Sequence, residues 1–232
     1  MSTLERIDYA DGETALTGWL ARPAGTPRAA VAVYPTFMNT TPGVEAKARA
    51  LAEQGCMAFI ADFYGPDAPH DIESANAAMM RLAADPVAMR TRLKATLAAL
   101  SQLAPGLPQI AIGFCLGGKA VLELARDGAD LVLVASFHGL LQSALPAKQA
   151  LKPRILVCHG DADFLVPRSH VTAFWEEMDA VQANWHFHSY AGVDHGFTNP
   201  LTPAGQPNPS YNATADRQSW AALLSHLDEV LG

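Results

Sequence analysis

The sequence predicts an α/β fold in which a mostly parallel central sheet carries helices on both faces. Short, continuous apolar runs alternate with amphipathic segments through most of the chain, which is the pattern of buried strands joined by helices. With 232 residues, half of them hydrophobic, the chain is long enough to bury one sizeable core. We therefore expect a single domain over residues 1–232.

The expected elements follow one another in order along the chain. Thr14–Ala21 alternates in polarity and stops before Pro23, as an antiparallel edge strand does. Apolar runs predict the further strands Ala29–Tyr34, Met57–Ala61, Gln109–Gly113, Leu131–Phe137, Arg154–His159 and Trp185–Tyr190. Helical periodicity predicts the helices Val44–Gln54, Ser74–Ala83, Val87–Leu103, Leu116–Arg126, Ser169–Val181 and Ala213–Leu231.

Two connections between these elements bear on where a site lies. The connection from Phe137 to Arg154 is too short for a large cap domain, so we expect a site that is open or covered only by loops. Asn199–Tyr211 contains four prolines and no apolar period, which makes it the one long irregular segment. Loops of this kind often border functional sites.

The composition excludes several classes of function. The net charge is −7 and Lys and Arg form no cluster, so we expect neither nucleic acid nor a membrane as a partner. No secretory signal and no bilayer-spanning apolar stretch is visible in the sequence. Cys56, Cys115 and Cys158 are odd in number and lack the spacing of metal ligands. A cytoplasmic protein with reduced thiols is the simplest interpretation.

A glycine-rich turn, Gly113-Phe114-Cys115-Leu116-Gly117-Gly118, follows an expected strand and opens an expected helix. A cysteine at this sharp turn projects above the sheet near a helix N-terminus, where the thiolate is favoured over the thiol. The Leu116 N–H is then placed to donate to an oxyanion on the substrate. The alternative is that Cys115 is a small buried apolar residue, but the strand, turn and helix context favours a nucleophile.

An acid and a histidine follow this turn along the chain, each just beyond an expected strand. Asp163 follows the strand ending near His159, and His195 follows the strand ending near Tyr190. This chain order of nucleophile, acid and histidine is that of α/β-hydrolases, in which His195 takes the thiol proton and Asp163 orients the imidazole. Asp161 is a rival acid, although an Asp in such a turn often only caps backbone N–H groups. Asp194 is expected to serve the loop.

Other candidate residues are supported by fewer observations. The Phe37 N–H follows the first parallel strand and is our candidate for a second oxyanion donor. His138 ends an expected strand and either lines the pocket or caps the strand, the second being favoured. His159, Asp161 and Asp163, or the pair His186 and His188, could also be read as metal ligands, but neither set makes a convincing site. We therefore expect no metal.

Taken together, these residues resemble the dienelactone hydrolase family over nearly the whole chain. The cysteine in place of the more usual serine at the elbow is the specific element. The matching pieces are Leu51-Ala52-Glu53-Gln54-Gly55, Ala61-Asp62-Phe63-Tyr64-Gly65, the Cys115 turn, Asp163-Phe164-Leu165-Val166-Pro167 and His195-Gly196-Phe197. The resemblance implies a Cys115, His195, Asp163 triad and hydrolysis of an enol-lactone such as carboxymethylenebutenolide, without metal or cofactor.

The chain departs from the family pattern at two substrate-binding positions. Where well-known members have a glutamate that helps to generate the thiolate, this chain has Thr36. Where they have an arginine shortly after the catalytic histidine, this chain has Asn199. Arg81 is near the position of a second family arginine, but the sequence does not place it in the pocket. We expect Thr36, Tyr64 and Asn199 to contact the substrate.

The sequence therefore predicts a hydrolase that cleaves a small ester or lactone through an acyl-cysteine intermediate. Two alternatives remain open at this point: a thioester or acyl-transfer enzyme that uses the same triad, and a catalytically silent binding protein of the same fold. The expected partner is a small-molecule substrate, and the chain is expected to be a monomer or a small homo-oligomer.

Overall fold

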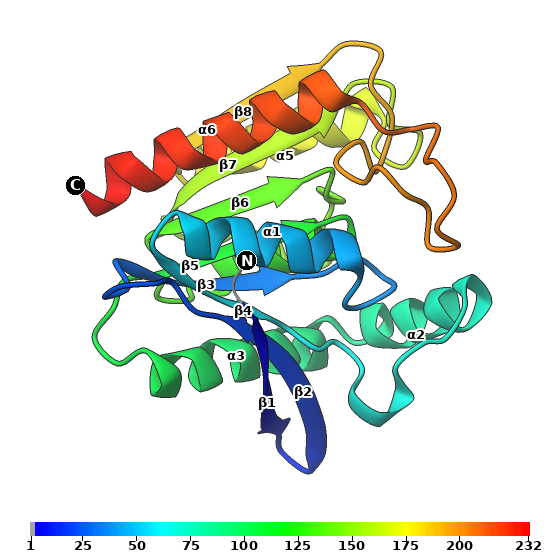
Figure 1. Ribbon diagram of the computed structural model, residues 1–232. Coiled ribbons are helices and arrows are strands. Elements are labelled where there is room, and N and C mark those ends of the chain that lie inside the picture. The colour runs from blue at the N-terminus through cyan, green and yellow to red at the C-terminus, as the bar shows by residue number, and fades with distance from the viewer. Residues whose placement is uncertain (1–2) are drawn as a thin grey trace.

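The computed structural model describes residues 3–232 and has an eight-stranded sheet between two layers of helices (Figure 1). The strand order is β1-β2-β4-β3-β5-β6-β7-β8, and the six strands from β4 to β8 in this order are parallel. The strands are β1 (Leu4–Asp11), β2 (Thr14–Ala21), β3 (Ala29–Tyr34), β4 (Cys56–Ile60), β5 (Gln109–Phe114), β6 (Leu133–Phe137), β7 (Arg154–Gly160) and β8 (Trp185–Tyr190).

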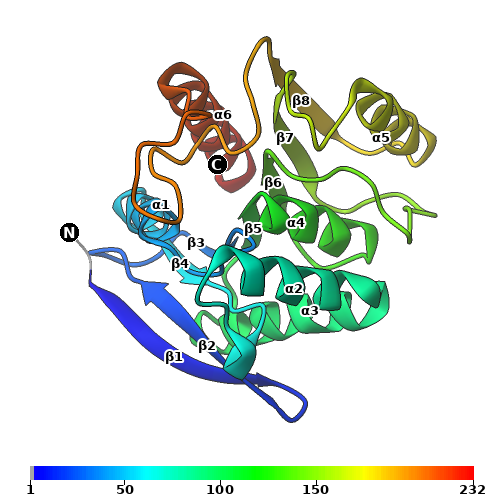
Figure 2. The same ribbon diagram turned by 90° about the vertical axis from the view of Figure 1, so that its right-hand side faces the viewer.

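The helices divide between the two faces of the sheet (Figure 2). They are α1 (Pro42–Glu53), α2 (Ile72–Ala84), α3 (Pro86–Leu103), α4 (Leu116–Arg126), α5 (Arg168–Ala180) and α6 (Ala213–Leu231), with a short 3-10 turn at Gly65–Asp67. Helices α1 and α6 bury their apolar side chains against one face, and α3, α4 and α5 cover the other. Both faces of the central strands are therefore buried, which explains why these strands are continuous apolar runs. Within residues 3–232, no helix combines the length and apolarity that crossing a bilayer requires.

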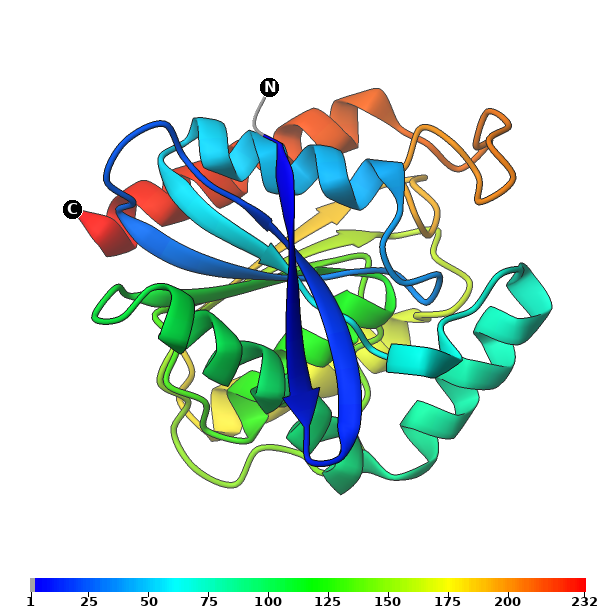
Figure 3. The same ribbon diagram turned by 60° about the horizontal axis from the view of Figure 1, so that its bottom comes forward.

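The predicted fold class is confirmed, and the ends of the predicted strands and helices lie within two residues of those observed. One expectation is wrong: Thr14–Ala21 is antiparallel but is not the edge strand, because β1 pairs with its outer side along its whole length. Figure 3 brings this β1–β2 hairpin forward. Strand β1 is half exposed and rich in charged residues, so its apolar pattern is weak. The signal that could have found it is Gly12, because glycine is favoured at the first central position of a two-residue hairpin turn such as Gly12-Glu13.

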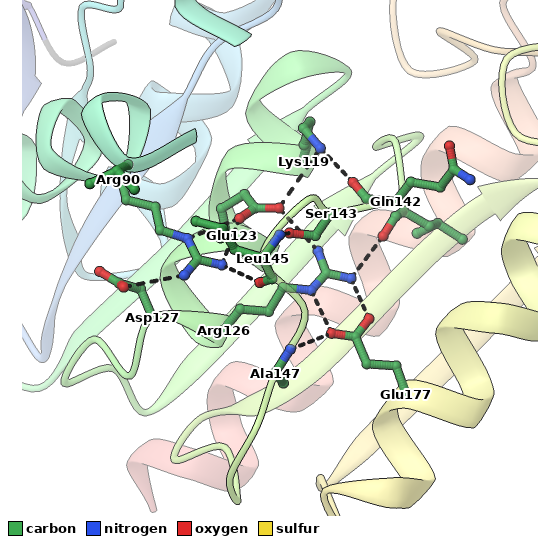
Figure 4. A network of polar contacts seen from close by, with 12 residues as sticks. Arg90, Lys119, Glu123, Arg126, Asp127, Gln142, Ser143, Leu145, Ala147 and Glu177 are labelled. Carbon is green, nitrogen blue, oxygen red and sulfur yellow. Dashed lines mark hydrogen bonds and ion pairs between the residues drawn. The ribbon is translucent and has the colours of Figure 1, made fainter. Parts of the chain in front are cut away.

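The connection between β6 and β7, residues 138–153, is held down by buried charged side chains (Figure 4). Arg126 donates to the carbonyl of Leu141 at 2.8 Å, and Arg90 donates to the carbonyl of Leu145 at 2.6 Å. The same two arginines are paired with the carboxylate of Glu123. Because arginines offer several donors in a fixed geometry, each one satisfies an ion pair and a loop carbonyl together. This short connection forms no cap domain.

We expect Arg126→Met to destabilise the protein by about 3–5 kcal/mol, because breaking a buried ion pair leaves its partner charge unpaired. The Arg126 side chain is 1% exposed and pairs with both Glu123 and Glu177. The measurement is the free energy of unfolding in urea. The matched control is Lys152→Met, which breaks an exposed pair with Asp130 and should change stability by at most about 1 kcal/mol. Equal losses in the two variants would contradict the expectation.

Candidate active site

The backbone at Cys115 forms a sharp turn between β5 and α4. Cys115 has φ 56° and ψ −113°, in the left-handed region that residues other than glycine rarely adopt. The turn also requires glycines on both sides: a Cβ at Gly113 would lie 2.0 Å from the carbonyl oxygen of Gly117, and one at Gly117 would lie 2.0 Å from that of Tyr34. The thiol is thereby held at the N-terminus of α4, above the carboxyl ends of the parallel strands.

His195 and Asp163 lie on two neighbouring turns at this end of the sheet. The Nδ1–H of His195 donates to Oδ2 of Asp163 at 2.7 Å, and the Asp163 side chain is fully buried. The other carboxylate oxygen of Asp163 accepts from the Leu165 amide at 2.9 Å. The Ala162 amide donates to the carbonyl of Val193 at 3.0 Å and so joins the two turns. The structure therefore fixes the tautomer and the orientation of the imidazole.

The Nε2 atom of His195 is buried and has no hydrogen-bond partner within residues 3–232. Burial opposes the charged form of this imidazole, but the interactions with Asp163 and with Cys115 outweigh it and raise the pKa of His195 to about 10. The arrangement thus favours an imidazolium at neutral pH beside the thiol, with Asp163 on the far side of the ring. A cationic imidazole in this position favours a thiolate on the neighbouring cysteine, which is how many cysteine nucleophiles are activated.

The rival acid Asp161 and the loop residue Asp194 have other surroundings. Asp161 pairs with Arg168 through two hydrogen bonds of 3.1 and 2.6 Å, and the hydrogen bonding to this arginine lowers the pKa of the Asp161 carboxyl. Asp194 is exposed. Of the three carboxylates, it is Asp163 that contacts the His195 ring.

Two backbone amides are available as oxyanion donors at the mouth of the site. Leu116 is the first residue of α4, so its N–H has no acceptor within the helix. Phe37 lies in the turn after β3, and no described residue accepts a hydrogen bond from its amide. Phe37 lines the same cavity as Cys115, and Leu116 directly follows Cys115 in the chain.

The turn that carries Phe37 is held by residues of the next strand's loop. The Tyr64 hydroxyl donates to the Phe37 carbonyl at 3.0 Å. The Asn39 side chain donates to Asp62 at 2.9 Å, and Asp62 also accepts from the Tyr64 amide. The Asp62-Phe63-Tyr64 segment that was recognised as a sequence motif therefore positions the backbone of a candidate oxyanion donor.

A cavity of about 520 Å³ opens onto Cys115 and His195. Its walls come from three loops: the one after β3, the one before α2 and the one before α6. Figure 2 shows the orange loop before α6 and the teal helix α2 flanking this end of the sheet. In the part of the chain that the structure describes, no Lys, Arg, Asp or Glu side chain lines the cavity. Apart from Cys115, His138 and His195, the residues of the wall are therefore either apolar or polar and uncharged.

The residues expected to contact the substrate have different locations. Thr36 and Asn199 both line the cavity. Tyr64 is buried and does not line the cavity, and its hydroxyl donates to the Phe37 carbonyl. Arg81 is exposed in the last turn of α2 and does not line the cavity either. The structure thus places Thr36 and Asn199 in the same cavity as Cys115 and His195, and leaves Tyr64 and Arg81 outside its wall.

The possible metal ligands do not converge. Among residues 3–232, no group of three or more His, Cys, Asp or Glu side chains is arranged to hold a metal ion. His159 is buried, and neither of its ring nitrogens is hydrogen-bonded to a described residue. Near it, Asp161 is hydrogen-bonded to Arg168, and Asp163 is hydrogen-bonded to His195. His186 lies against His226, their ring centroids 4.9 Å apart.

Sequence reasoning missed one contributor to the site. Thr198 is buried and bonded to His138, whose ring lies in the cavity wall and not merely at the strand end. No local pattern marks Thr198, because its partner is 60 residues away. The irregular segment Asn199–Tyr211, which was expected to border a site, forms one wall of the cavity and contains a bridge between Leu201 and Pro207.

Comparisons with known proteins agree with this architecture. The model of the dienelactone hydrolase family matches residues 16–231. The crystal structure of a dienelactone hydrolase-like promiscuous phosphotriesterase from metagenomic libraries is 32% identical, covers 99% of both chains and has a TM-score of 0.89. A structure named m3DLH is also 32% identical over 99% of both chains, with a TM-score of 0.90. The uncharacterized protein K02A2.1 of Caenorhabditis elegans is 39% identical over 127 residues, which cover 52% of this chain and 78% of that protein.

Proposed function

Because the chain belongs to the dienelactone hydrolase family, we propose that it is a carboxylic ester hydrolase that cleaves a small ester or lactone through an acyl-cysteine intermediate. The observation that carries the proposal is the alignment of three groups at the cavity. Asp163 holds one nitrogen of His195, and Cys115 lies close enough to interact with the same imidazole, whose other nitrogen is not occupied by any other hydrogen bond within residues 3–232. This is the relation between acid, base and nucleophile that covalent acyl transfer requires.

The reaction proceeds in two halves. The Cys115 thiolate attacks the carbonyl carbon, and the carbonyl oxygen becomes an oxyanion that accepts from the Leu116 and Phe37 amides. As this intermediate collapses, the bond to the alkoxide or enolate breaks, and the His195 imidazolium gives its proton to the leaving oxygen. Neutral His195 then takes a proton from water, whose oxygen attacks the thioester carbonyl. Collapse releases the carboxylic acid and returns the thiolate and imidazolium.

The experiment that tests this proposal is acid quenching of the protein during turnover of an activated ester, followed by mass spectrometry. We expect an acyl group on the peptide that contains Cys115, formed and lost at rates that match turnover. Turnover that needs an added thiol or alcohol would instead identify an acyl-transfer enzyme, and the absence of both adduct and turnover across a panel of esters and lactones would leave a binding protein. Either result would overturn the proposal.

We expect neutral esters and lactones to be better substrates than carboxylated lactones of the same size. No cationic side chain lines the cavity within the described residues. Asn199 lines it at the position where the family resemblance implies an arginine for the substrate carboxylate. Asn199→Arg should therefore raise kcat/KM for the carboxylated lactone by about tenfold, the value of one partly exposed charge-assisted hydrogen bond. The measurement is kcat/KM for a matched neutral and carboxylated pair.

The matched control for this substitution is Leu201→Arg, which places the same charge on an exposed residue of the cavity wall whose side chain makes no hydrogen bond. Only the variant at position 199 should favour the carboxylated lactone. A wild-type preference for the carboxylated lactone that Asn199→Arg leaves unchanged would show that another group binds the anion.

A second candidate activity is the hydrolysis of phosphotriesters. A relative that is 32% identical over 99% of both chains is described as a promiscuous phosphotriesterase. The Cys115 thiolate would attack phosphorus as the alkoxide or phenolate leaves with the proton of His195, and the same two amides would donate to the phosphoryl oxygen. Diethyl p-nitrophenyl phosphate, assayed beside a p-nitrophenyl ester, separates the two activities.

A further inference from the structure

His138 lies between the two turns that carry the nucleophile and the base. It directly follows β6, has φ 41° and is completely buried. Its Nδ1 atom is 3.1 Å from the amide nitrogen of Cys115, and its Nε2 atom is 2.9 Å from Oγ1 of Thr198. A glycine would adopt this backbone conformation with less strain, so the presence of histidine points to a use of the side chain.

The two contacts determine which nitrogen of His138 carries the proton. The amide of Cys115 is a donor that the carbonyl of Phe137, at 3.0 Å, and Nδ1 of His138 share. Nδ1 therefore accepts and is unprotonated, and Nε2–H then donates to the hydroxyl of Thr198. Burial above all, and then the neighbouring charges of His195 and Lys47, hold the pKa of His138 well below its ordinary value. The ring is therefore neutral beside the His195 imidazolium, and a proton on Nδ1 would break its contact with Cys115.

The ring of His138 also packs directly against the base. Its centroid is 5.2 Å from that of His195 with the planes at 69°, and 5.3 Å from that of Phe197 with the planes at 77°. Thr198 follows His195 by three residues, on the same turn. One side chain thus contacts the nucleophile's backbone through one nitrogen, the base's turn through the other, and the base itself through its ring.

We propose that His138 is a positioning residue that joins the Cys115 turn and the His195 turn into one unit, so that thiol and imidazole keep the separation that proton transfer needs. This inference rests on the proposed function, because it assigns His138 to the same reaction. Errors of position near 1 Å are enough to cost about 100-fold in rate. A shared link between the two turns therefore has a measurable effect on catalysis.

The first test is His138→Phe, which keeps a buried ring but removes both nitrogens. We expect kcat for a neutral activated ester to fall by about 10- to 100-fold, while KM changes by less than about threefold. The second readout is the titration of His195, followed by nitrogen-15 NMR of the histidine rings. Looser contacts with Asp163 and Cys115 should lower the pKa of His195 by about one unit from its wild-type value.

A second pair of variants keeps the test decisive if His138→Phe fails to fold. Thr198→Val removes the acceptor of the Nε2–H and should reproduce both effects, whereas Thr198→Ser retains a hydroxyl and should restore wild-type behaviour. His226→Phe is the control for a generic loss of packing, because His226 is equally buried but lies on α6 and does not line the cavity. It should leave the His195 titration unchanged.

The two readouts separate this proposal from the proposed function. If the wild-type protein hydrolysed no ester, the proposed function would fail, and the His195 titration alone would still decide the role of His138. If the His138→Phe and Thr198→Val variants folded and the titration of His195 were unchanged, the positioning role would be overturned. A fall in kcat alone would not rescue it, because that fall would then come from lower stability or poorer substrate fit.

Discussion

Cys115→Ala is expected to lower kcat for ester hydrolysis by about 10⁴-fold or more while the protein remains folded. The thiolate is the atom that attacks the carbonyl, and the remaining oxyanion donors cannot replace a missing nucleophile. In a well-studied serine protease, removal of the nucleophile costs about 10⁶ in kcat. The measurements are turnover of a neutral activated ester and the circular dichroism spectrum of the variant.

Cys56→Ala is a matched control, because it makes the same chemical change at a buried cysteine. Cys56 lies on β4, which is separated from β5 by β3. This variant should keep wild-type kcat. Cys115→Ser should remain folded and lose most activity, because an alkoxide is much harder to generate than a thiolate beside the same imidazole. If the activity of Cys115→Ala were within a few-fold of the wild type, Cys115 would not be the nucleophile.

Asp163→Asn is expected to lower kcat by about 10⁴-fold, the cost of the same replacement in a serine protease triad. An amide at this position offers Nδ1 of His195 the wrong partner, so the imidazole adopts the tautomer that cannot take a proton from Cys115. The substitution also removes the buried negative charge that helps to raise the pKa of His195 to about 10. Steady-state kinetics on the same ester give the effect.

Asp161→Asn is the control for this substitution, since Asp161 lies in the same turn and binds Arg168 instead of His195. Its kcat should remain within a few-fold of the wild type. Equal losses of kcat in the two variants, or a larger loss at position 161, would show that Asp163 is not the carboxylate that orients His195 during the reaction.

Much of this architecture was predictable from local patterns in the sequence. The strands of the central sheet are buried on both faces, so their apolar runs stand out, and each helix has a clear amphipathic period or cap. The turn at Cys115 was recognisable because its glycines are needed by the local backbone. Asp163 and His195 follow strands whose carboxyl ends must meet in a parallel sheet, so their proximity followed from the topology alone.

The parts that escaped prediction depend on contacts between distant segments. Strand β1 is stabilised by pairing with β2 and not by its own apolarity. Tyr64 was expected to contact the substrate, but its side chain is buried and its hydroxyl donates to the Phe37 carbonyl. This burial depends on tertiary packing, which no local pattern in the sequence reveals. The link from Cys115 through His138 to Thr198 joins three segments far apart in the chain. No periodicity or motif in a single sequence contains that information.

The clamped connection between β6 and β7 also indicates where the chain could accept a fused peptide. Its first half is pinned through the carbonyls of Leu141 and Leu145, whereas residues 148–150 are exposed and outside regular secondary structure. Insertions are best tolerated at such unpaired, solvent-facing backbone. Since β6 and β7 are parallel, the residues just before β7 lie at the opposite end of the sheet from Cys115. A tether inserted there would attach the protein to a support with the mouth of its cavity facing away from the surface.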